Sequence, residues 1–154
     1  MRFMIIVKAT RDSEAGILPE DKLIAEMGRY HEELAKAGML VDASGLQASS
    51  KGCLILYSGG KRNYVDGPFA ETKELIAGYT IIQAKSREEA IEWTRRFPNP
   101  AHYGKEGEIE VRPIFELDDF EQTEAVQRFR ELGLRERTIR RDADVEMTSS
   151  APPR

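Results

Sequence analysis

The sequence predicts an α+β protein with a ferredoxin-like αβ plait, in which two helices cover one face of an antiparallel sheet. Two observations support this fold class. Apolar runs rich in β-branched residues alternate with amphipathic stretches in the order strand, helix, strand, strand, loop, strand, helix, strand. A chain of 154 residues with 40% hydrophobic and 32% charged residues also has the size and composition of one globular domain.

The strands are predicted from short apolar runs bounded by turn residues. The first run is largely apolar, as in a buried strand, whereas the last alternates charged and apolar residues, as a half-exposed strand does. Small residues with Gly at 49–52 and 58–61 are typical of turns. The predicted strands cover residues 3–9, 39–46, 53–57, 63–65, 79–84 and 108–115.

Two helices are predicted from apolar residues spaced three and four positions apart. The first begins near Pro19, with carboxylates in its first turn that favour the positive end of the helix dipole, and ends at Gly38. The second begins after Ser86, a typical N-cap, and continues through Phe97 to the break at Pro98.

The composition changes after Leu117, so we expect a domain at residues 1–117 and a separate C-terminal segment at 118–154. A short helix is predicted from Asp118 to Leu132. The arginine-rich stretch at 135–141 and the Ser/Pro-rich end favour a solvated, partly disordered tail. The alternative is a docking arm for an acidic partner or for nucleic acid.

Charge and composition exclude several classes of protein. The net charge of −4 and the pI near 5.4 argue against a general nucleic-acid or anionic-membrane binder. No apolar stretch is long enough to span a membrane, and the N-terminus lacks the features of a signal peptide, so we expect a cytoplasmic protein. The single cysteine, Cys53, is expected to be a buried small hydrophobe, and no spacing of ligands suggests a metal or another cofactor.

The predicted architecture also suggests a homodimer. Two helices cover one face of the sheet, and an apolar face on the other side requires a cover of its own. A second copy of the chain is the simplest such cover.

The stretch DGPFAETKE, Asp66 to Glu74, fits neither a strand nor an amphipathic helix. Together with Gly78-Tyr79 it resembles the DGPF branch of the YCII-related family. Further matching pieces, which extend the resemblance over residues 1–117, are Ala37-Gly38, Gly45-Leu46, Glu89 to Trp93 and Ile109 to Pro113.

This resemblance implies a dimeric αβ plait of the dimeric α/β-barrel type, although most DGPF proteins have no established activity. Some members of the wider family are thought to use a His–Asp pair in a cleft, and one branch includes a dehydrochlorinase that acts on a chlorinated hydroxyquinol. Genes of the DGPF branch often lie beside those of extracytoplasmic-function sigma factors, which implies a signalling or stress-related role.

Asp66 and His31 are the candidate catalytic residues. Asp66 is the expected base or orienting group, although an Asp-Gly-Pro turn also explains it structurally if its carboxylate accepts a backbone N–H two residues on. His31 lies beside the apolar stripe of the first helix; the family's helix histidine aligns near Met27, and a position at the edge of the stripe is the alternative. His102 is expected to be a surface histidine in a loop.

The candidate ligand-binding residues are polar or aromatic groups near the motif. Charged side chains beside Phe69 suit a small polar ligand or a partner chain, but they also suit salt bridges that fix the loop. Arg112 is expected either to pair with a carboxylate of the motif or to face solvent. These ligand-binding candidates are Phe69, Glu71, Lys73, Tyr79 and Arg112.

Of the functions that follow, we take the first below as our main prediction. The first is a small-molecule cleft beside residues 66–74, with cofactor-free acid/base chemistry by Asp66 and His31. The alternative is a non-catalytic regulatory or binding module, linked to a sigma factor or another protein, with the arginine-rich tail as its contact arm. A dimer with a purely structural role is a third reading.

Overall fold

The computed structural model describes residues 1–70 and 72–133 and has an α+β architecture. Its main sheet is antiparallel, with the strand order β2-β5-β1-β6. This order is consistent with a ferredoxin-like fold, as the sequence predicted. The four strands are β1 (Arg2–Lys8), β2 (Leu40–Gly45), β5 (Ile76–Gln83) and β6 (Ile109–Pro113).

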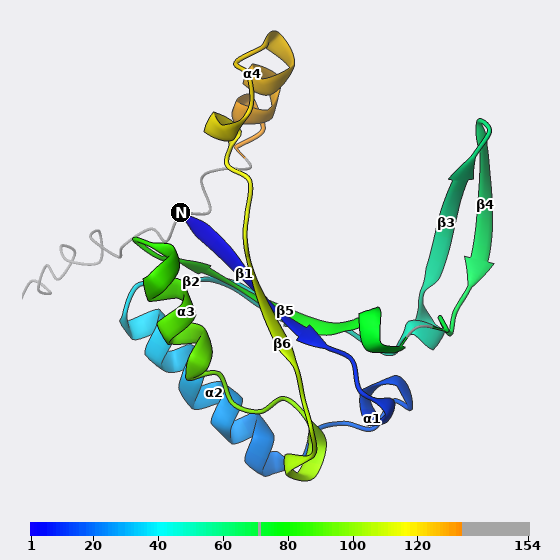
Figure 1. The fold of residues 1–154 in the computed structure, drawn as a ribbon, viewed down its shortest axis with the longest axis vertical. Coiled ribbons are helices and arrows are strands. Elements are labelled where there is room, and N and C mark those ends of the chain that lie inside the picture. Colours follow the sequence, from blue (N-terminus) through cyan, green and yellow to red (C-terminus); the bar gives the residue numbers. More distant parts are fainter. Residues whose placement is uncertain (71, 134–154) are drawn as a thin grey trace, which may run out of the picture.

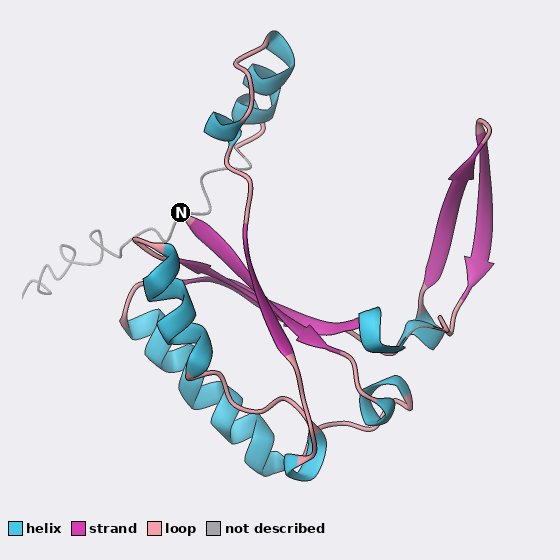
Figure 2. Ribbon diagram, viewed as in Figure 1, coloured by secondary structure: helices cyan, strands magenta, loops and turns pink. Residues whose placement is uncertain are grey.

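Two helices, α2 (Asp21–Lys36) and α3 (Arg87–Arg95), lie on one face of this sheet (Figures 1 and 2). The start of α3 and the end of α2 follow from capping residues that the sequence analysis identified. The Ser86 hydroxyl accepts a hydrogen bond from the Glu89 N–H at 3.2 Å. Gly38 has a φ of 68°, the left-handed conformation that commonly follows a helix C-terminus.

The core lies between the helices and the sheet. Phe3, Ile5 and Ile82 point from the strands toward the helices and are almost completely buried. Tyr30 of α2 packs edge-on against Phe97 and donates a 3.0 Å hydrogen bond to the Trp93 carbonyl. Burial disfavours the phenolate and raises the pKa of Tyr30 to about 12. The side of the sheet that faces α2 and α3 is thus a packed interior.

The opposite side of the sheet, which we call the open face, carries no helix of the residues that the structure describes. It is defined by the side chains that alternate with the core residues: Met4, Ile6, Tyr79 and Ile81. The pairs Met4–Ile81 and Ile6–Tyr79 stand opposite each other on β1 and β5. An apolar strip therefore runs along the middle of this face.

Two segments project from the body of the fold (Figure 1). Strands β3 (Cys53–Ser58) and β4 (Lys61–Asp66) pair only with each other, in a separate two-stranded sheet. Cys53 is exposed, so its prediction as a buried residue was wrong, because the apolar run that contains it lies in this hairpin and not in the core.

The second projection contains α4 (Glu124–Glu131). The helix begins later than predicted, because Thr123 and not Asp118 caps it: the Thr123 hydroxyl accepts from the Val126 N–H at 3.3 Å. Residues Leu117–Asp119 form a separate 3₁₀ turn, η4. The predicted arginine-rich tail lies outside the described residues.

One element was not predicted. Helix α1 (Arg11–Glu14) is held by a capping box, in which Thr10 and Ser13 exchange side-chain and backbone hydrogen bonds. Within the described residues, none of the helices has the length and apolar character that crossing a bilayer requires.

Candidate functional site

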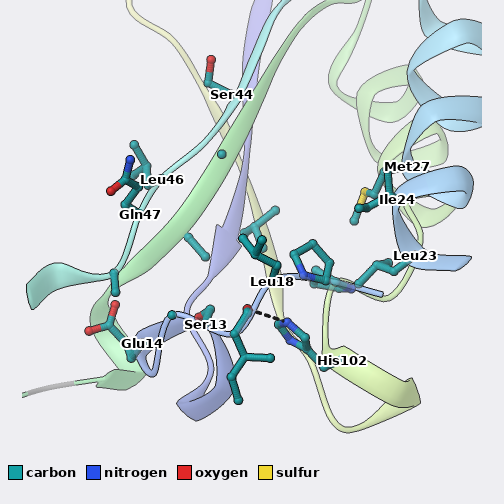
Figure 3. A pocket seen from close by; sticks show the side chains of 18 of the residues that line it. Ser13, Glu14, Leu18, Leu23, Ile24, Met27, Ser44, Leu46, Gln47 and His102 are labelled. Carbon is teal, nitrogen blue, oxygen red and sulfur yellow. Dashed lines mark hydrogen bonds between the residues drawn. The ribbon is translucent and has the colours of Figure 1, made fainter. Parts of the chain in front are cut away.

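A cavity of about 850 Å³ lies on the helix side of the sheet, at the end where β2 finishes and β5 begins (Figure 3). We call it the helix-side cavity. Its volume falls in the range of small-molecule sites, and most of its lining is apolar. Its lining comes from the end of α1 and the segment before α2 (13–19), from α2 (Leu23, Ile24, Met27, His31), and from β2 with the segment after it (43–48, 50, 51). The sheet adds Val7 of β1 and Ala77, Tyr79 and Thr80 of β5, and the segment after α3 adds Phe97, Pro100 and His102.

His31 and Thr80 form the polar pair of this cavity. The His31 Nδ1 lies 2.7 Å from the Met27 carbonyl oxygen, one turn earlier on α2. A carbonyl oxygen only accepts, so Nδ1 carries the proton in this contact. Nε2 lies 2.8 Å from the Thr80 hydroxyl, and in the neutral imidazole it is the acceptor for that hydroxyl proton.

This geometry fixes the orientation and the tautomer of His31. The lone pair of Nε2 points at a hydroxyl that belongs to the cavity wall, and the other ring nitrogen is held by the backbone. A histidine whose second nitrogen is anchored in this way is the arrangement that acid/base chemistry requires. The sequence analysis named His31 but missed Thr80, although a polar residue inside the apolar run at 79–84 was a signal for it.

His102 also lines this cavity. It is only 4% exposed, so its prediction as a surface histidine was wrong. Its Nε2 donates to the Ile17 carbonyl at 2.9 Å, whereas Nδ1 is buried and has no hydrogen-bond partner among the described residues. The histidine thereby holds the α1–α2 connection against the turn that contains it.

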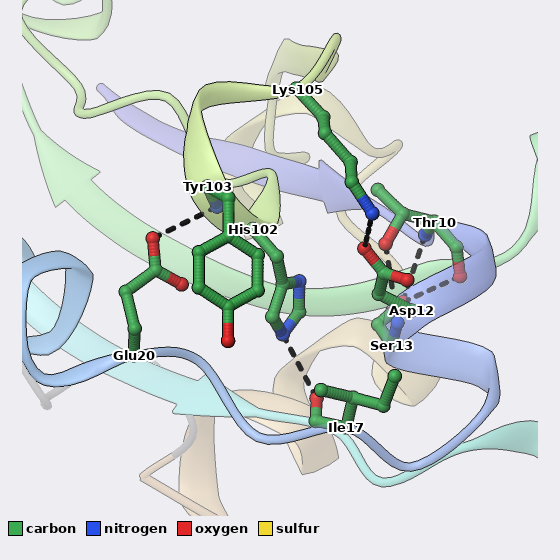
Figure 4. A network of polar contacts seen from close by, with 8 residues as sticks. All are labelled: Thr10, Asp12, Ser13, Ile17, Glu20, His102, Tyr103 and Lys105. Carbon is green, nitrogen blue, oxygen red and sulfur yellow. Dashed lines mark hydrogen bonds and ion pairs between the residues drawn. The ribbon is translucent and has the colours of Figure 1, made fainter.

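Further polar contacts around His102 fix the same two segments (Figure 4). Lys105 Nζ contacts the Asp12 carboxylate at 2.7 Å, and this contact lowers the pKa of Asp12. The Tyr103 N–H donates to Glu20 at 2.9 Å. Backbone hydrogen bonds, first that of Glu20 itself and then that of Tyr103, lower the pKa of Glu20. These contacts are local and leave the cavity interior apolar.

The DGPF loop is tied to the cavity wall through Ser49. Gly67 packs so closely on this residue that a Cβ would lie 1.8 Å from the Ser49 carbonyl oxygen, so only glycine fits. The Gly67 N–H donates to Gly52 at 3.0 Å, and the Phe69 N–H donates to the Ser49 hydroxyl at 3.0 Å. The Gly67–Pro68 peptide bond is cis.

Ser49 in turn binds the Glu14 carboxylate with both its hydroxyl, at 2.5 Å, and its backbone N–H, at 3.1 Å. Glu14 lines the cavity. A continuous chain of hydrogen bonds therefore links the motif, the 3₁₀ turn η1 (Ser49–Lys51) and helix α1. Neither Glu14 nor Ser49 was identified from the sequence, because nothing in their local pattern shows that they meet.

Of the predicted site residues, only His31 and Tyr79 line the cavity. The Tyr79 hydroxyl donates to Asp42 at 3.2 Å, and its side chain alternates with that of Thr80, so it belongs to the open face. Phe69 is half-buried in the DGPF loop, and Lys73 is exposed in the 3₁₀ turn η2 (Thr72–Glu74). Glu71 lies outside the described residues.

Asp66 ends β4, and its carboxylate accepts a 2.6 Å hydrogen bond from the Tyr64 hydroxyl. The expected bond to the backbone two residues on was wrong, because that residue is Pro68, which has no N–H. Asp66 is not among the residues that line the cavity.

Arg112 contacts Glu110, and Glu110 also contacts Lys8 at 2.9 Å. These two cations hold the pKa of Glu110 at about 2. Of the two expectations for Arg112, pairing with a carboxylate of the motif was not found among the described residues, whereas a solvent-facing side chain was, because Arg112 is 66% exposed. Within residues 1–70 and 72–133, no three His, Cys, Asp or Glu side chains gather as a metal site would require.

The structure thus defines an α+β protein with an antiparallel sheet and a cavity between that sheet and its helices. A family model for the YCII-related domain matches residues 1–118, and the chain belongs to the YCII-related family. It is also similar to an uncharacterized protein of Rhizobium meliloti (strain 1021). The two are 28% identical over 95 residues, which cover 62% of this chain and 75% of that protein.

Proposed function

We propose that this chain is a cytoplasmic homodimer of the DGPF branch that binds a small polar or aromatic compound in the helix-side cavity and performs cofactor-free acid/base chemistry on it. The observation that carries the proposal is the His31–Thr80 pair at the wall of a mostly apolar cavity of about 850 Å³. The branch assignment rests on the motif from Asp66 to Glu74, and the homodimer rests on the open face.

The pair supplies a route for one proton. The Thr80 hydroxyl donates to His31 Nε2 and still has lone pairs that accept from an O–H or N–H of a bound ligand. As the ligand proton passes to Thr80, the hydroxyl proton passes to Nε2. The ligand becomes an anion and His31 an imidazolium, whose Nδ1–H stays on the Met27 carbonyl. Imidazole suits this role because one ring nitrogen accepts the proton while the other keeps its hydrogen bond.

Asp66 remains the proposed orienting group, but it acts indirectly, because it does not line the cavity. Its loop is joined to the cavity wall through Ser49 and Glu14, so a change at the loop is expected to alter the position of Glu14. Direct contact with the ligand stays a prediction for four further residues, which are Phe69, Glu71, Lys73 and Arg112.

A thermal-shift screen with a metabolite library tests the proposal. A compound that binds the native state raises the melting temperature by mass action. The matched variant is Ile24→Trp, which places a larger side chain at the cavity lining without changing charge. We expect a hit to lose its shift in Ile24→Trp and to keep it in Lys36→Gln, a substitution on the exposed end of α2.

Catalysis is then tested with the same compound. Positioned general acid/base groups contribute about 10²–10⁴-fold in rate, so His31→Gln should retain binding and lose about that factor in turnover. Hits that are indifferent to Ile24→Trp would show that the cavity is not the binding site. Hits that bind the cavity but are never converted would leave a binding protein and reject the enzyme.

A second candidate function is a non-catalytic regulatory module that binds an extracytoplasmic-function sigma factor or another protein. Two exposed apolar side chains, Phe129 on α4 and Leu132 at its C-cap, favour it because such residues commonly mark protein interfaces. Gel filtration of the chain with a sigma factor encoded beside it, with and without residues 135–154, separates the two candidates. A complex that requires the tail supports the module, and the absence of any complex rejects it.

A further inference from the structure

The hairpin β3–β4, residues 53–66, carries apolar side chains on both of its faces. We call it the hairpin arm. In its register Leu54 stands opposite Val65 on one face, and Ile55 stands opposite Tyr64 on the other. All four side chains are exposed. An isolated two-stranded hairpin is marginally stable in water, so exposed apolar residues on both faces indicate that a partner covers it.

The segment after β6, residues 114–133, has the same character. We call it the C-terminal arm. Phe115 is 76% exposed, and its ring lies tilted against that of Phe120, with the ring centroids 5.3 Å apart. Phe129 on α4 and Leu132 at its C-cap are also exposed. Both projecting segments therefore lack an apolar cover within the described part of one chain.

The two arms leave the main sheet at opposite ends. The hairpin arm leads into the start of β5, where Ile76 pairs with Lys8 at the end of β1. The C-terminal arm follows Pro113, which pairs with Phe3 at the start of β1. Both arms stand away from α2 and α3, one at each end of the sheet (Figure 1). The open face lies between them.

The two arms also differ in charge. In the hairpin arm, Lys61 and Arg62 begin β4 directly after the turn. The C-terminal arm carries six carboxylates and two arginines, at Glu116, Asp118, Asp119, Glu121, Glu124, Glu131, Arg128 and Arg130. Like charges that meet across an interface are unfavourable, so two hairpin arms should not pair with each other, and neither should two C-terminal arms.

We propose that the two subunits of the homodimer exchange these arms, so that the hairpin arm of each packs on the C-terminal arm of the other. This inference rests on the homodimer proposed above. If a two-fold axis packs the two open faces together in opposite directions, the hairpin arm of each subunit meets the C-terminal arm of the other, and the two contacts are identical. The exchange covers the apolar residues of both arms and places basic turns on acidic segments.

Charge reversal of one arm at a time tests this pairing in the full chain. The first variant, Lys61→Glu with Arg62→Glu, reverses the hairpin turn, and the second, Glu121→Lys with Glu131→Lys, reverses the C-terminal arm. All four side chains are exposed, so folding should be unaffected. Each variant replaces opposite-charge contacts by like-charge contacts on both sides of the two-fold axis, so each should raise the dimer Kd about tenfold.

The variant that carries all four substitutions should recover a Kd close to that of the wild type, because its arms again have opposite charges. Sedimentation equilibrium at low ionic strength measures all three, and high salt should reduce the differences. The matched control for the hairpin variant is Lys22→Glu with Lys36→Glu, which lowers the net charge by the same amount on the exposed side of α2 and should leave the Kd unchanged.

The failures of the two proposals are distinguishable. A monomeric wild-type chain overturns the homodimer and with it the arm exchange. A dimeric wild type whose Kd is the same in both single-arm variants overturns the exchange and leaves the homodimer standing. Loss of affinity in the single-arm variants without recovery in the combined variant also overturns the pairing of opposite arms.

Discussion

The two sides of the main sheet differ in where their apolar residues find partners. On the helix side, Phe3 and Ile82 are buried by side chains of the same chain, and the remaining space is the cavity that holds His31. On the other side, Met4 and Ile81 lie on a face without helices, and the arms beyond it expose aromatic residues. The chain therefore packs α2 and α3 on one side of the sheet, and no described helix covers the other side.

The largest expected effect contrasts a core residue with an arm residue. Phe3→Ala should lower the free energy of unfolding by about 3–5 kcal/mol, because it opens a cavity in the packed interior. Ile55→Ala in the hairpin arm should change the stability of the monomer by about 0.5 kcal/mol or less. Urea unfolding at protein concentrations below the dimer Kd measures both, and a large effect of Ile55→Ala would show that the arm belongs to the core.

The next effect concerns the root of the hairpin arm. Gly67→Ala places a methyl group against the Ser49 carbonyl and should destabilise the chain by about 2 kcal/mol or more. Gly45→Ala is the matched control, because its Cβ would meet no atom within 4 Å. Hydrogen exchange should show the loss at residues around 49 and 67. Equal effects of the two substitutions would contradict the role assigned to Gly67.

A smaller effect is expected at the polar pair of the cavity. Thr80→Val keeps the shape of the side chain but removes the donor to His31 Nε2, which should cost about 1–3 kcal/mol. Thr80→Ser retains the hydroxyl and should cost less. Thermal unfolding compares the two, and a Thr80→Ser variant that is less stable than Thr80→Val would show that the methyl group matters more than the hydrogen bond.

The smallest effect is a pH dependence on the open face. Glu110 has a pKa of about 2 in the folded chain because Arg112 and Lys8 contact it, against 4.5 ordinarily. A folded-state pKa below the unfolded value means that this contribution to stability is present above about pH 4.5 and is lost as the pH falls toward 2. In Glu110→Gln this part of the acid sensitivity should disappear. Urea unfolding between pH 5 and pH 2 measures it, and parallel curves for the two proteins would contradict the assignment.

The sequence predicted the covered side well, because its signals are periodic. Strands β1 and β5 and helix α2 follow from runs of apolar residues and from caps such as Gly38, which depend only on near neighbours in the chain. The same reasoning failed at Cys53, because an apolar run looks identical in a buried strand and in an exposed hairpin.

The candidate site was predicted in part for a related reason. His31 was identified from its place on a helix, and the motif at Asp66 from its resemblance. Thr80 and Glu14 lie 49 and 35 residues away from the groups that they contact, so only the folded chain shows the contacts. His102 was misplaced because a loop that packs under another segment has no periodic signal.

The close packing of Gly67 on Ser49 has a consequence for engineering this protein. The hairpin arm is held where it joins the fold, by the packing of Gly67 on Ser49, and its two strands pair with no other described strand. A change in the length of the arm should therefore leave the shape of the cavity unchanged. The turn at Gly59-Gly60 is therefore a suitable insertion point for a peptide tag or a fluorescent reporter. An insertion there lies outside the helix-side cavity, and by displacing Lys61 and Arg62 it should weaken the proposed arm exchange.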